Sequence, residues 1–468
     1  MKNIIFLFSI ISIYSFGQTK NKNFNQFLKD EQVKNAQVSF TVLLNDAANV
    51  ADKGGTQGAI INYNTNKLMY PASLQKLITT KIALDILGPG FKYKTKVKFK
   101  GVVLGNVFKG IIEVIGSGDP SLDETFVNEV YAFLVSKKIN KIEGYLKVTQ
   151  KVFDDNAPQS WLVEDVANYY GAVAYSFNYK MNLYKIKLKQ AAFGEKPTLI
   201  STDPYQRNLE FENQLISAEA DAPDKAYVLG MSFSNKRRIV GSIPSGNEVF
   251  TIKGSDNKPA QTFKNELIKK FQDKQFSFVF NENVNAAKTV FEFSHSSEIL
   301  AELLKEMNQR SINLYAESIL KTIAIKEYDV PGTTEIGIKA IEQKIALGQY
   351  HFYDGSGMSR KNLWSGGLLI GFLSTYAKET SSNHNKVFKN SLGVSGISGT
   401  MKYFSSVAIK GKVTGKSGSA DGVLNYAGYF TDNKGIEYSF VFMINNYSGD
   451  RKVLRRKMVN VLEDFIVQ

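Results

Sequence analysis

The chain has 468 residues, 43% of them hydrophobic, and 58 Lys and Arg against 44 Asp and Glu give a formal net charge of +14. This length is ample for a buried core and exceeds that of a single compact domain. The absence of cysteine excludes disulfide bonds, a lipoprotein anchor, a cysteine nucleophile and thiolate metal sites.

The N-terminus has the pattern of a secretory signal peptide. Lys2 gives a charged start, residues 4–14 form a largely apolar run, and residues 15–17 include the small residues of a cleavage site. We therefore expect residues 1–17 to be a cleavable signal peptide, Gln18 to begin the mature chain, and the protein to be exported to the periplasm. No later stretch is apolar over the roughly 18 residues of a transmembrane helix. An uncleaved N-terminal anchor is the alternative.

Helix and strand patterns alternate in the next part of the chain. Residues 22–34 have a helical pattern, and residues 38–44 and 59–63 have strand patterns. A second helix is predicted from Ser73, because apolar residues recur at helical spacing until residues 88–90, Gly-Pro-Gly, end the run. These elements should form the first part of a split domain.

The second helix begins with a Ser-x-x-Lys tetrad, Ser73-Leu74-Gln75-Lys76. Positions three apart share one face of a helix, so the Ser73 hydroxyl and the Lys76 amine can meet at hydrogen-bond distance. The helix N-terminus favours an alkoxide and lowers the pKa of a nearby ammonium group. The tetrad therefore indicates a serine nucleophile that is activated without histidine.

Strand patterns dominate the middle of the chain. Helical runs are scarce there, and Thr125–Ser136 is the clearest of them. We expect one or two inserted β-rich domains in residues 91–290. The predicted strands are residues 95–99, 102–107, 111–115, 142–148, 184–188 and 276–280.

Helical periodicity returns after residue 290, at residues 298–305, 336–347 and 366–376, and strands are predicted at 423–430 and 437–445. A final amphipathic helix follows. Its apolar stripe comprises Leu454, Met458, Val461 and Phe465, and its basic cluster comprises Arg451, Lys452, Arg455, Arg456 and Lys457. The basic cluster is interpreted as a solvated face, with a contact to a membrane surface or the cell wall as the alternative.

The excess of basic residues suits a partner rich in carboxylates, and no nucleic-acid-binding motif accompanies it. The alternative is that the excess positive charge only aids solubility. The three histidines, His295, His351 and His384, are widely separated, and none lies in a nucleophile-elbow context. We therefore expect no metal site and no cofactor.

Two further short motifs follow the Ser-x-x-Lys tetrad in chain order. Ser311-Ile312-Asn313 opens a predicted helix, and Lys416-Ser417-Gly418-Ser419 precedes the strand pattern at residue 423. In this order, Ser-x-x-Lys, Ser-x-Asn and Lys-Ser-Gly resemble the motif set of penicillin-recognising serine acyltransferases. Each triplet alone is common in proteins of this length, whereas the ordered set is specific.

The surrounding sequence narrows the resemblance to class C low-molecular-mass penicillin-binding proteins, the penicillin-binding protein 4 type of D-alanyl-D-alanine carboxypeptidase and endopeptidase. The interval between Lys76 and Ser311 is far longer than in class A β-lactamases, and this family fills it with inserted domains. Further stretches similar to the family are Gly116–Leu122, Trp161–Ala172, Asp354–Arg360 and Gly399–Met401.

This resemblance implies an α+β fold, in which a penicillin-recognising α/β sandwich of the β-lactamase/transpeptidase type carries long β-rich insertions. The catalytic domain should be split into residues 18–90 and 291–468, around the inserted residues 91–290.

The resemblance also implies roles for the motif residues. Ser73 attacks the carbonyl of a D-Ala-terminated peptide bond and forms an acyl-enzyme. Lys76 is the expected base, and the Lys416 ammonium across the cleft should depress its pKa. Ser311 should relay the proton to the leaving amine, and Asn313 should orient Lys76 and the substrate backbone. Alternatives are a helix N-cap for Ser311 and a solvated strand position for Lys416.

The third motif should bind the substrate carboxylate. Lys416 supplies a positive charge and Ser417 a hydroxyl, while Gly418 belongs to the same substrate-binding strand. The backbone N–H groups of Ser73 and Ser419 should form the oxyanion hole. Ser417 stands where the family usually has threonine, so we expect altered kinetics with the chemistry retained.

Two charged residues outside the motifs are candidates for substrate contacts. Arg360 should lie at the mouth of the cleft, and the Asp155 carboxylate should bind a free amine on the third residue of the stem peptide. A structural salt bridge or a turn contact is the alternative for each.

The sequence therefore predicts a penicillin-sensitive periplasmic serine DD-carboxypeptidase/DD-endopeptidase that hydrolyses D-alanyl bonds of peptidoglycan stem peptides. β-Lactam antibiotics should be covalent inhibitors. Alternatives are a non-catalytic peptidoglycan-binding or penicillin-sensing protein and a β-lactamase, and the long insertion disfavours the β-lactamase. Both peptidase activities cleave the same kind of bond, and no residue pattern specifies an oligomeric state.

Overall fold

The computed structural model describes residues 21–45, 59–284, 286, 288–345, 350–378 and 383–467. The expected signal peptide and the expected mature start at Gln18 lie outside the described residues.

A six-stranded antiparallel sheet forms the centre of one half of the molecule, in the order β19-β20-β21-β22-β1-β2. Its central strands are buried along almost their whole length, because helices cover both faces, and their sequences are accordingly near-continuous apolar runs. The strands are β1 (Gln37–Leu44), β2 (Ala59–Tyr63), β19 (Gly393–Val394), β20 (Val413–Ala420), β21 (Val423–Thr431) and β22 (Glu437–Asn445).

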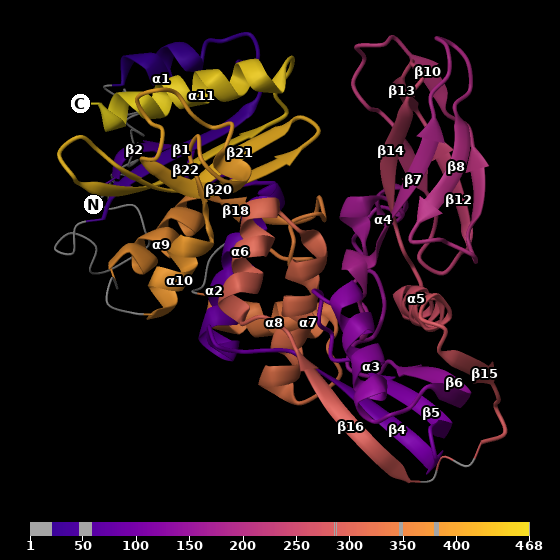
Figure 1. Ribbon diagram of the computed structural model, residues 1–468. Helices are drawn as coiled ribbons and strands as arrows, with labels where there is room; N and C mark the ends of the chain where they lie inside the picture. The colour runs from indigo at the N-terminus through magenta and orange to yellow at the C-terminus, as the bar shows by residue number, and fades with distance from the viewer. Residues whose placement is uncertain are drawn as a thin grey trace, which may run out of the picture.

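Two helices cover the first face of this sheet, α1 (Lys22–Phe27) and α11 (Arg451–Ile466) (Figure 1). The predicted apolar stripe of α11 packs into this layer. Its basic cluster is only partly solvated, because Arg455 bonds the Tyr426 hydroxyl and Lys457 pairs with Asp30. The predicted helix at residues 22–34 is wrong in length, since helix α1 ends at Phe27 and turns follow.

The second face is covered by a helical layer that shares one apolar core with the sheet (Figure 1). The helices are α2 (Gln75–Leu87), α6 (Leu300–Arg310), α7 (Asn313–Tyr328), α8 (Thr334–Lys344), α9 (Gly366–Lys378) and α10 (Asn383–Ser391). A small sheet, β17-β18-β3, lies at the edge of this layer. Its strands are β3 (Leu68–Met69), β17 (Tyr350–His351) and β18 (Leu363–Ser365).

The middle of the chain forms two further strand-rich bodies, each with its own apolar core, as the strand patterns predict. The first is a five-stranded sheet, β15-β6-β5-β4-β16, packed on two helices. Its elements are β4 (Lys94–Leu104), β5 (Val107–Ile115), α3 (Glu124–Ser136), β6 (Lys141–Thr149), α5 (Pro259–Asp273), β15 (Ser277–Phe280) and β16 (Thr289–Ser296).

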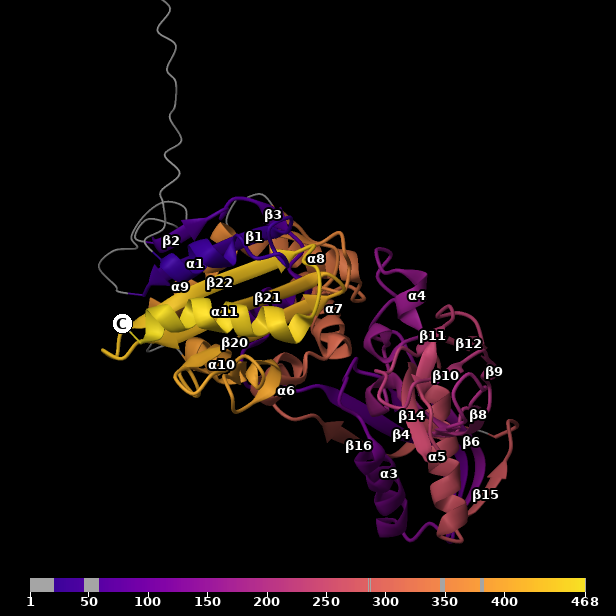
Figure 2. The ribbon, with the colours of Figure 1, turned by 90° about the horizontal axis from the view of Figure 1, so that it is seen from above.

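The second body consists of three small sheets, β14-β7-β8, β11-β12-β9 and β10-β13. Both bodies lie to one side of the six-stranded sheet, and β16 leads the chain back to helix α6 (Figures 1 and 2). The strands of the second body are β7 (Leu183–Lys189), β8 (Thr198–Asp203), β9 (Glu210–Asn213), β10 (Ile216–Ala218), β11 (Tyr227–Leu229), β12 (Lys236–Val240), β13 (Ser242–Pro244) and β14 (Val249–Ser255).

A largely irregular segment, residues 150–182, connects the two bodies and returns to the helical layer. It contains α4 (Val163–Val166) and the short 3₁₀ turns η2 (Tyr169–Gly171) and η3 (Lys180–Asn182). Asp154 of this segment accepts a hydrogen bond from Lys321 of α7, and Trp161 donates one to Asp354 in the loop between β17 and β18. Within the described residues, no helix combines the length and the apolar character needed to cross a bilayer.

Candidate active site

Ser73 lies in the 3₁₀ turn η1 (Ala72–Leu74), directly before helix α2. Three contacts hold this turn. The Asn425 side chain donates to the Tyr70 carbonyl at 2.9 Å, and β20 packs against the turn. Gly357 lies so close to it that a Cβ on this glycine would be 1.9 Å from the Ala72 carbonyl oxygen. Ala72 itself has a φ of 48°. This packing holds Ala72 in the left-handed region, immediately before the candidate nucleophile.

The Lys76 side chain is fully buried and lies beneath Ser73. Its Nζ donates to Ser73 Oγ at 3.0 Å, to Asn313 Oδ1 at 2.6 Å and to the Ser356 carbonyl at 2.7 Å. The Ser–Lys hydrogen bond that the three-residue spacing predicts is therefore present, and Asn313 orients the amine as expected.

The two motif lysines differ from solvent-exposed lysines in their proton affinity. Burial lowers the pKa of the Lys76 ammonium to about 7, although the charges of Asp354 and Glu317 oppose this shift. Burial, and then repulsion from Lys76, lower the pKa of Lys416. The largest cause of the Lys76 shift is thus burial, and an effect of the Lys416 charge on the pKa of Lys76 stays a prediction.

The second motif lies where two helices meet. Ser311 caps the C-terminus of α6 with a φ of 57°, and Ile312 occupies the N-cap position of α7. The alternative of Ser311 as an N-cap is therefore wrong. Its hydroxyl accepts a hydrogen bond from Lys416 Nζ at 3.0 Å.

The third motif lies on β20, directly against the nucleophile turn. Lys416 is fully buried, so the alternative of a solvated strand residue is wrong. A Cβ on Gly418 would lie 2.3 Å from the Pro71 carbonyl oxygen, so only glycine allows this approach. The Ser417 N–H donates to Thr400 Oγ1 at 3.1 Å, while the Ser419 side chain is exposed. The structure thus brings all three motifs together.

Two buried carboxylates next to the motifs are absent from the predicted site. Asp354 accepts hydrogen bonds from Trp161 Nε1 at 2.9 Å and from three groups of its own loop, the Gly357 and Ser359 N–H groups and the Asn362 amide. Glu317 accepts bonds from the backbone of the same loop. The available sequence signal is spacing, because Glu317 follows Asn313 by one helical turn.

Comparison with known proteins identifies the family. The model of the D-Ala-D-Ala carboxypeptidase 3 (S13) family matches residues 21–465. The chain belongs to this family. The predicted family and enzyme class, a serine-type D-Ala-D-Ala carboxypeptidase, are thereby confirmed.

Two relatives and one crystal structure support this assignment. D-alanyl-D-alanine carboxypeptidase DacB of Haemophilus influenzae is 28% identical over 406 residues, which are 83% of each chain. A D-alanyl-D-alanine carboxypeptidase of Actinomadura sp. is 23% identical over 404 residues, 81% of this chain and 74% of that one. The crystal structure of penicillin binding protein 4 from Haemophilus influenzae has a TM-score of 0.77 at 21% identity, covering 95% of this chain and 100% of that chain. The predicted fold class is confirmed.

Arg360 of this S13 family member is exposed at the end of the Asp354 loop. Burial raises the pKa values of the Tyr70 hydroxyl and the Asp165 carboxyl, and the charge of Arg360 partly opposes both shifts. Asp165 also accepts a hydrogen bond from the Tyr170 hydroxyl, and the Tyr170 carbonyl accepts one from the Asn313 amide at 2.8 Å. The connecting segment therefore reaches the site, a contact that sequence spacing does not indicate.

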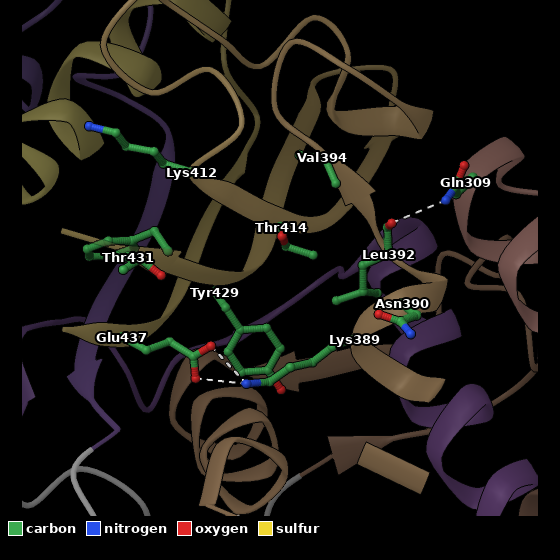
Figure 3. A pocket seen from close by; sticks show the side chains of 11 residues that line it. Gln309, Lys389, Asn390, Leu392, Val394, Lys412, Thr414, Tyr429, Thr431 and Glu437 are labelled. Atoms are coloured by element: carbon green, nitrogen blue, oxygen red, sulfur yellow. Dashed lines mark hydrogen bonds and ion pairs between the residues drawn. The ribbon is translucent and has the colours of Figure 1, made fainter. Parts of the chain in front are cut away.

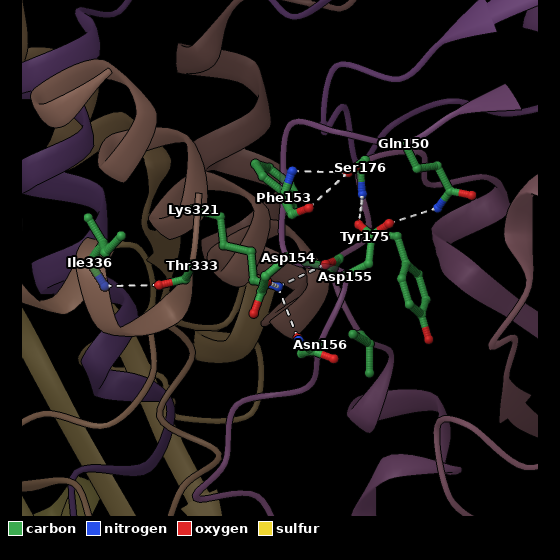
Figure 4. Close-up of polar contacts among 12 residues, drawn as sticks. Gln150, Phe153, Asp154, Asp155, Asn156, Tyr175, Ser176, Lys321, Thr333 and Ile336 are labelled. Carbon is green, nitrogen blue, oxygen red and sulfur yellow. Dashed lines mark hydrogen bonds and ion pairs between the residues drawn. The ribbon is translucent and has the colours of Figure 1, made fainter. Parts of the chain in front are cut away.

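Asp155 is bonded within its own segment (Figure 4). Its carboxylate accepts hydrogen bonds from the Ser176 N–H and from Gln150 Nε2. Its neighbour Asp154 pairs instead with Lys321 of α7 at 2.7 Å. These contacts favour the structural alternative for Asp155, and its contact with a substrate amine stays a prediction.

The ion pair between Lys321 and Asp154 predicts that removing its carboxylate alone lowers the stability of the fold. Lys321 is fully buried and also donates to two backbone carbonyls, whereas Asp154 is partly exposed. We expect Asp154→Ala to lower the free energy of unfolding by about 3 kcal/mol, because it leaves the buried Lys321 side chain without a charged partner. Adding Lys321→Met should recover part of this loss in denaturant unfolding. A double variant no more stable than Asp154→Ala would contradict the buried-charge explanation.

A cavity of about 260 Å³ lies between α10 and strands β19–β21 (Figure 3). None of the motif residues lines it, and Lys389 and Glu437 pair across its wall at 2.8 Å. Among residues with described positions, no group of three or more His, Asp or Glu side chains is arranged to hold a metal ion.

Proposed function

We propose that this S13 enzyme hydrolyses D-alanyl bonds of peptidoglycan stem peptides through an acyl-enzyme on Ser73, as a penicillin-sensitive DD-carboxypeptidase/DD-endopeptidase. The observation that carries the proposal is the hydrogen bond between Ser73 Oγ and the fully buried Lys76 Nζ. A lysine with a pKa of about 7 is substantially neutral at physiological pH, as a general base must be.

In the proposed acylation, Ser73 Oγ attacks the D-alanyl carbonyl and its proton passes to Lys76. The new C–O bond forms, the C–N bond to the terminal D-alanine breaks, and the leaving amine takes up the proton that Lys76 received, which returns Lys76 to its neutral form. Ser311, bonded to Lys416, is the proposed relay for that proton. Water then hydrolyses the ester and regenerates Ser73.

The geometry of β20 supports an oxyanion hole and a carboxylate site. The Ser417 N–H points away from β21 to Thr400, and the Ser419 N–H, two residues on, points the same way. We assign the oxyanion hole to the N–H groups of Ser73 and Ser419. Lys416 and the Ser417 hydroxyl would bind the terminal carboxylate, whose charge favours the ammonium form of Lys416.

The proposal also covers the inhibitors of the enzyme, its domain boundaries and its cellular localisation. One crystal structure of the Haemophilus influenzae penicillin binding protein 4 is a complex with a β-lactam, which supports β-lactam binding by this enzyme, and we propose that the inhibition is covalent. We assign the catalytic domain to residues 18–90 and 291–468, the insertion to residues 91–290, and the enzyme to the periplasm after cleavage of residues 1–17.

Product analysis on purified muropeptides tests the activity. Release of D-alanine from pentapeptides would establish a carboxypeptidase, and conversion of cross-linked dimers to monomers would establish an endopeptidase. Intact muropeptides and intact penicillin, without an adduct, would instead favour a wall-binding protein.

The low pKa of Lys76 predicts the pH dependence of acylation. The neutral base is populated as pH rises through about 7, so the acylation rate should rise between pH 6 and 8 and then level off. Stopped-flow labelling with a fluorescent penicillin measures this rate. A rising limb centred above pH 9 would show that Lys76 titrates like an exposed lysine.

A further inference from the structure

Glu317 is a buried carboxylate to which the proposed chemistry gives no role. It lies on α7, one turn beyond Asn313, and its side chain is fully buried. Oε1 accepts hydrogen bonds from the Gly355 N–H at 3.1 Å and the Ser356 N–H at 2.8 Å, and Oε2 accepts a second bond from the Gly355 N–H at 3.3 Å. A fully buried carboxylate that accepts two adjacent backbone N–H groups fixes the orientation of that backbone.

The backbone that Glu317 holds is the one that Lys76 contacts. The Ser356 carbonyl accepts a hydrogen bond from Lys76 Nζ at 2.7 Å. From the side of α2, Thr79 Oγ1 donates to the Gly355 carbonyl at 2.7 Å. The peptide groups of residues 355 and 356 are therefore bonded to α7 through their N–H groups and to α2 through their carbonyls.

The charges around Lys76 come from three elements. Glu317 on α7 and Asp354 of the loop favour its ammonium form, whereas burial disfavours it, and Lys416 on β20 lies close enough for its own pKa to be lowered by Lys76. Ser73 and Asn313 are the uncharged side chains that bond Nζ. Burial, and then Asp354, raise the pKa of Glu317 to about 8.

We propose that Glu317 is a positioning residue for acylation, which fixes the Ser356 carbonyl against Lys76 Nζ by holding the backbone of residues 355 and 356. The inference rests on the proposed role of Lys76 as the base. Glu317 itself touches neither the nucleophile nor any reacting atom, and it acts through the loop.

The variant Glu317→Gln tests this role, because glutamine keeps the shape but has no charge and only one acceptor oxygen. Acylation by a fluorescent penicillin should fall about tenfold at its plateau, because one of the two acceptor oxygens becomes an amide group that cannot accept from the backbone, so the Ser356 carbonyl is held less firmly. The rising limb of the pH profile should also move to lower pH, because an acceptor that favours the ammonium form of Lys76 is held less firmly and the charge that Glu317 carries above its pKa of about 8 is absent.

A matched control separates this role from general destabilisation. Thr322→Ala, on the same helix, removes bonds to Tyr93 and to the Ser318 carbonyl but does not touch the loop. It should leave both plateau and midpoint unchanged. Thr79→Val, which releases the other side of the Gly355 peptide without changing charge, should lower the plateau and serves as the test if Glu317→Gln does not fold.

The outcomes distinguish the inference from the proposed function. If the wild-type protein forms no penicillin adduct, the proposed function fails. If the wild-type protein is acylated and Glu317→Gln, or Thr79→Val where the first does not fold, gives the rate profile of Thr322→Ala, the positioning role is overturned.

Discussion

Replacing Lys76 by methionine is expected to lower the rate of acylation of Ser73 by about 10³-fold, because general-base catalysis supplies effects of this order. Methionine fills a similar volume but has no amine to accept the Ser73 proton, whereas Lys76 Nζ lies 3.0 Å from Ser73 Oγ. The rate is measured with a fluorescent penicillin at saturating concentration.

Two controls accompany this measurement. Lys81→Met changes a lysine further along α2, where it pairs with Asp85 at the surface, and should leave acylation unchanged. The unfolding midpoint of Lys76→Met should not fall enough to explain the loss, because the substitution also removes the cost of burying an amine. A Lys76→Met protein that is acylated within tenfold of wild type would exclude Lys76 as the base.

The second large effect is expected at Gly418, where β20 meets the nucleophile turn. In Gly418→Ala the new Cβ would lie 2.3 Å from the Pro71 carbonyl and 3.1 Å from the Leu74 nitrogen, so strand and turn must separate. We expect a loss of about 2 kcal/mol or more in the free energy of unfolding and at least a tenfold loss in acylation rate.

Gly90→Ala is the matched control, because a Cβ there meets no atom within 4 Å. It should change neither the unfolding midpoint nor acylation. A Gly418→Ala protein with wild-type values of both would show that the strand and the turn do not need this close contact.

The parts of the site that the sequence predicts are those set by local spacing and by recognisable motifs. The bond between Ser73 and Lys76 follows from a three-residue spacing, and the ordered motifs indicate that Ser311, Asn313 and Lys416 converge. The strand-rich middle of the chain also follows from period-two patterns.

The parts that the sequence does not predict depend on contacts between distant backbone groups. The Ser356 carbonyl that binds Lys76 has no residue-type signature, because every residue carries a carbonyl. The role of Glu317 depends on the same loop. The helix from residue 22 ends early at Phe27, where turns bring Asp30 to Lys457 of the distant C-terminal helix.

The sequence also does not predict the main cause of the low pKa of Lys76. Charge counting along the sequence favours Lys416 as the cause, since it is the other lysine of the motif set. In the structure burial is the largest cause, and two carboxylates that oppose it are supplied by the loop at residue 354 and by α7. Burial is a property of the packed fold and cannot be derived from motif spacing.

The most direct test of the proposed mechanism is intact-mass analysis of the purified mature protein after exposure to a fluorescent penicillin, beside its Ser73→Ala variant. We expect a stable one-to-one adduct on the wild-type chain and none on the variant. An adduct that persists in Ser73→Ala would contradict the assignment of Ser73 as the nucleophile, and rapid destruction of the penicillin without a stable adduct would indicate a β-lactamase.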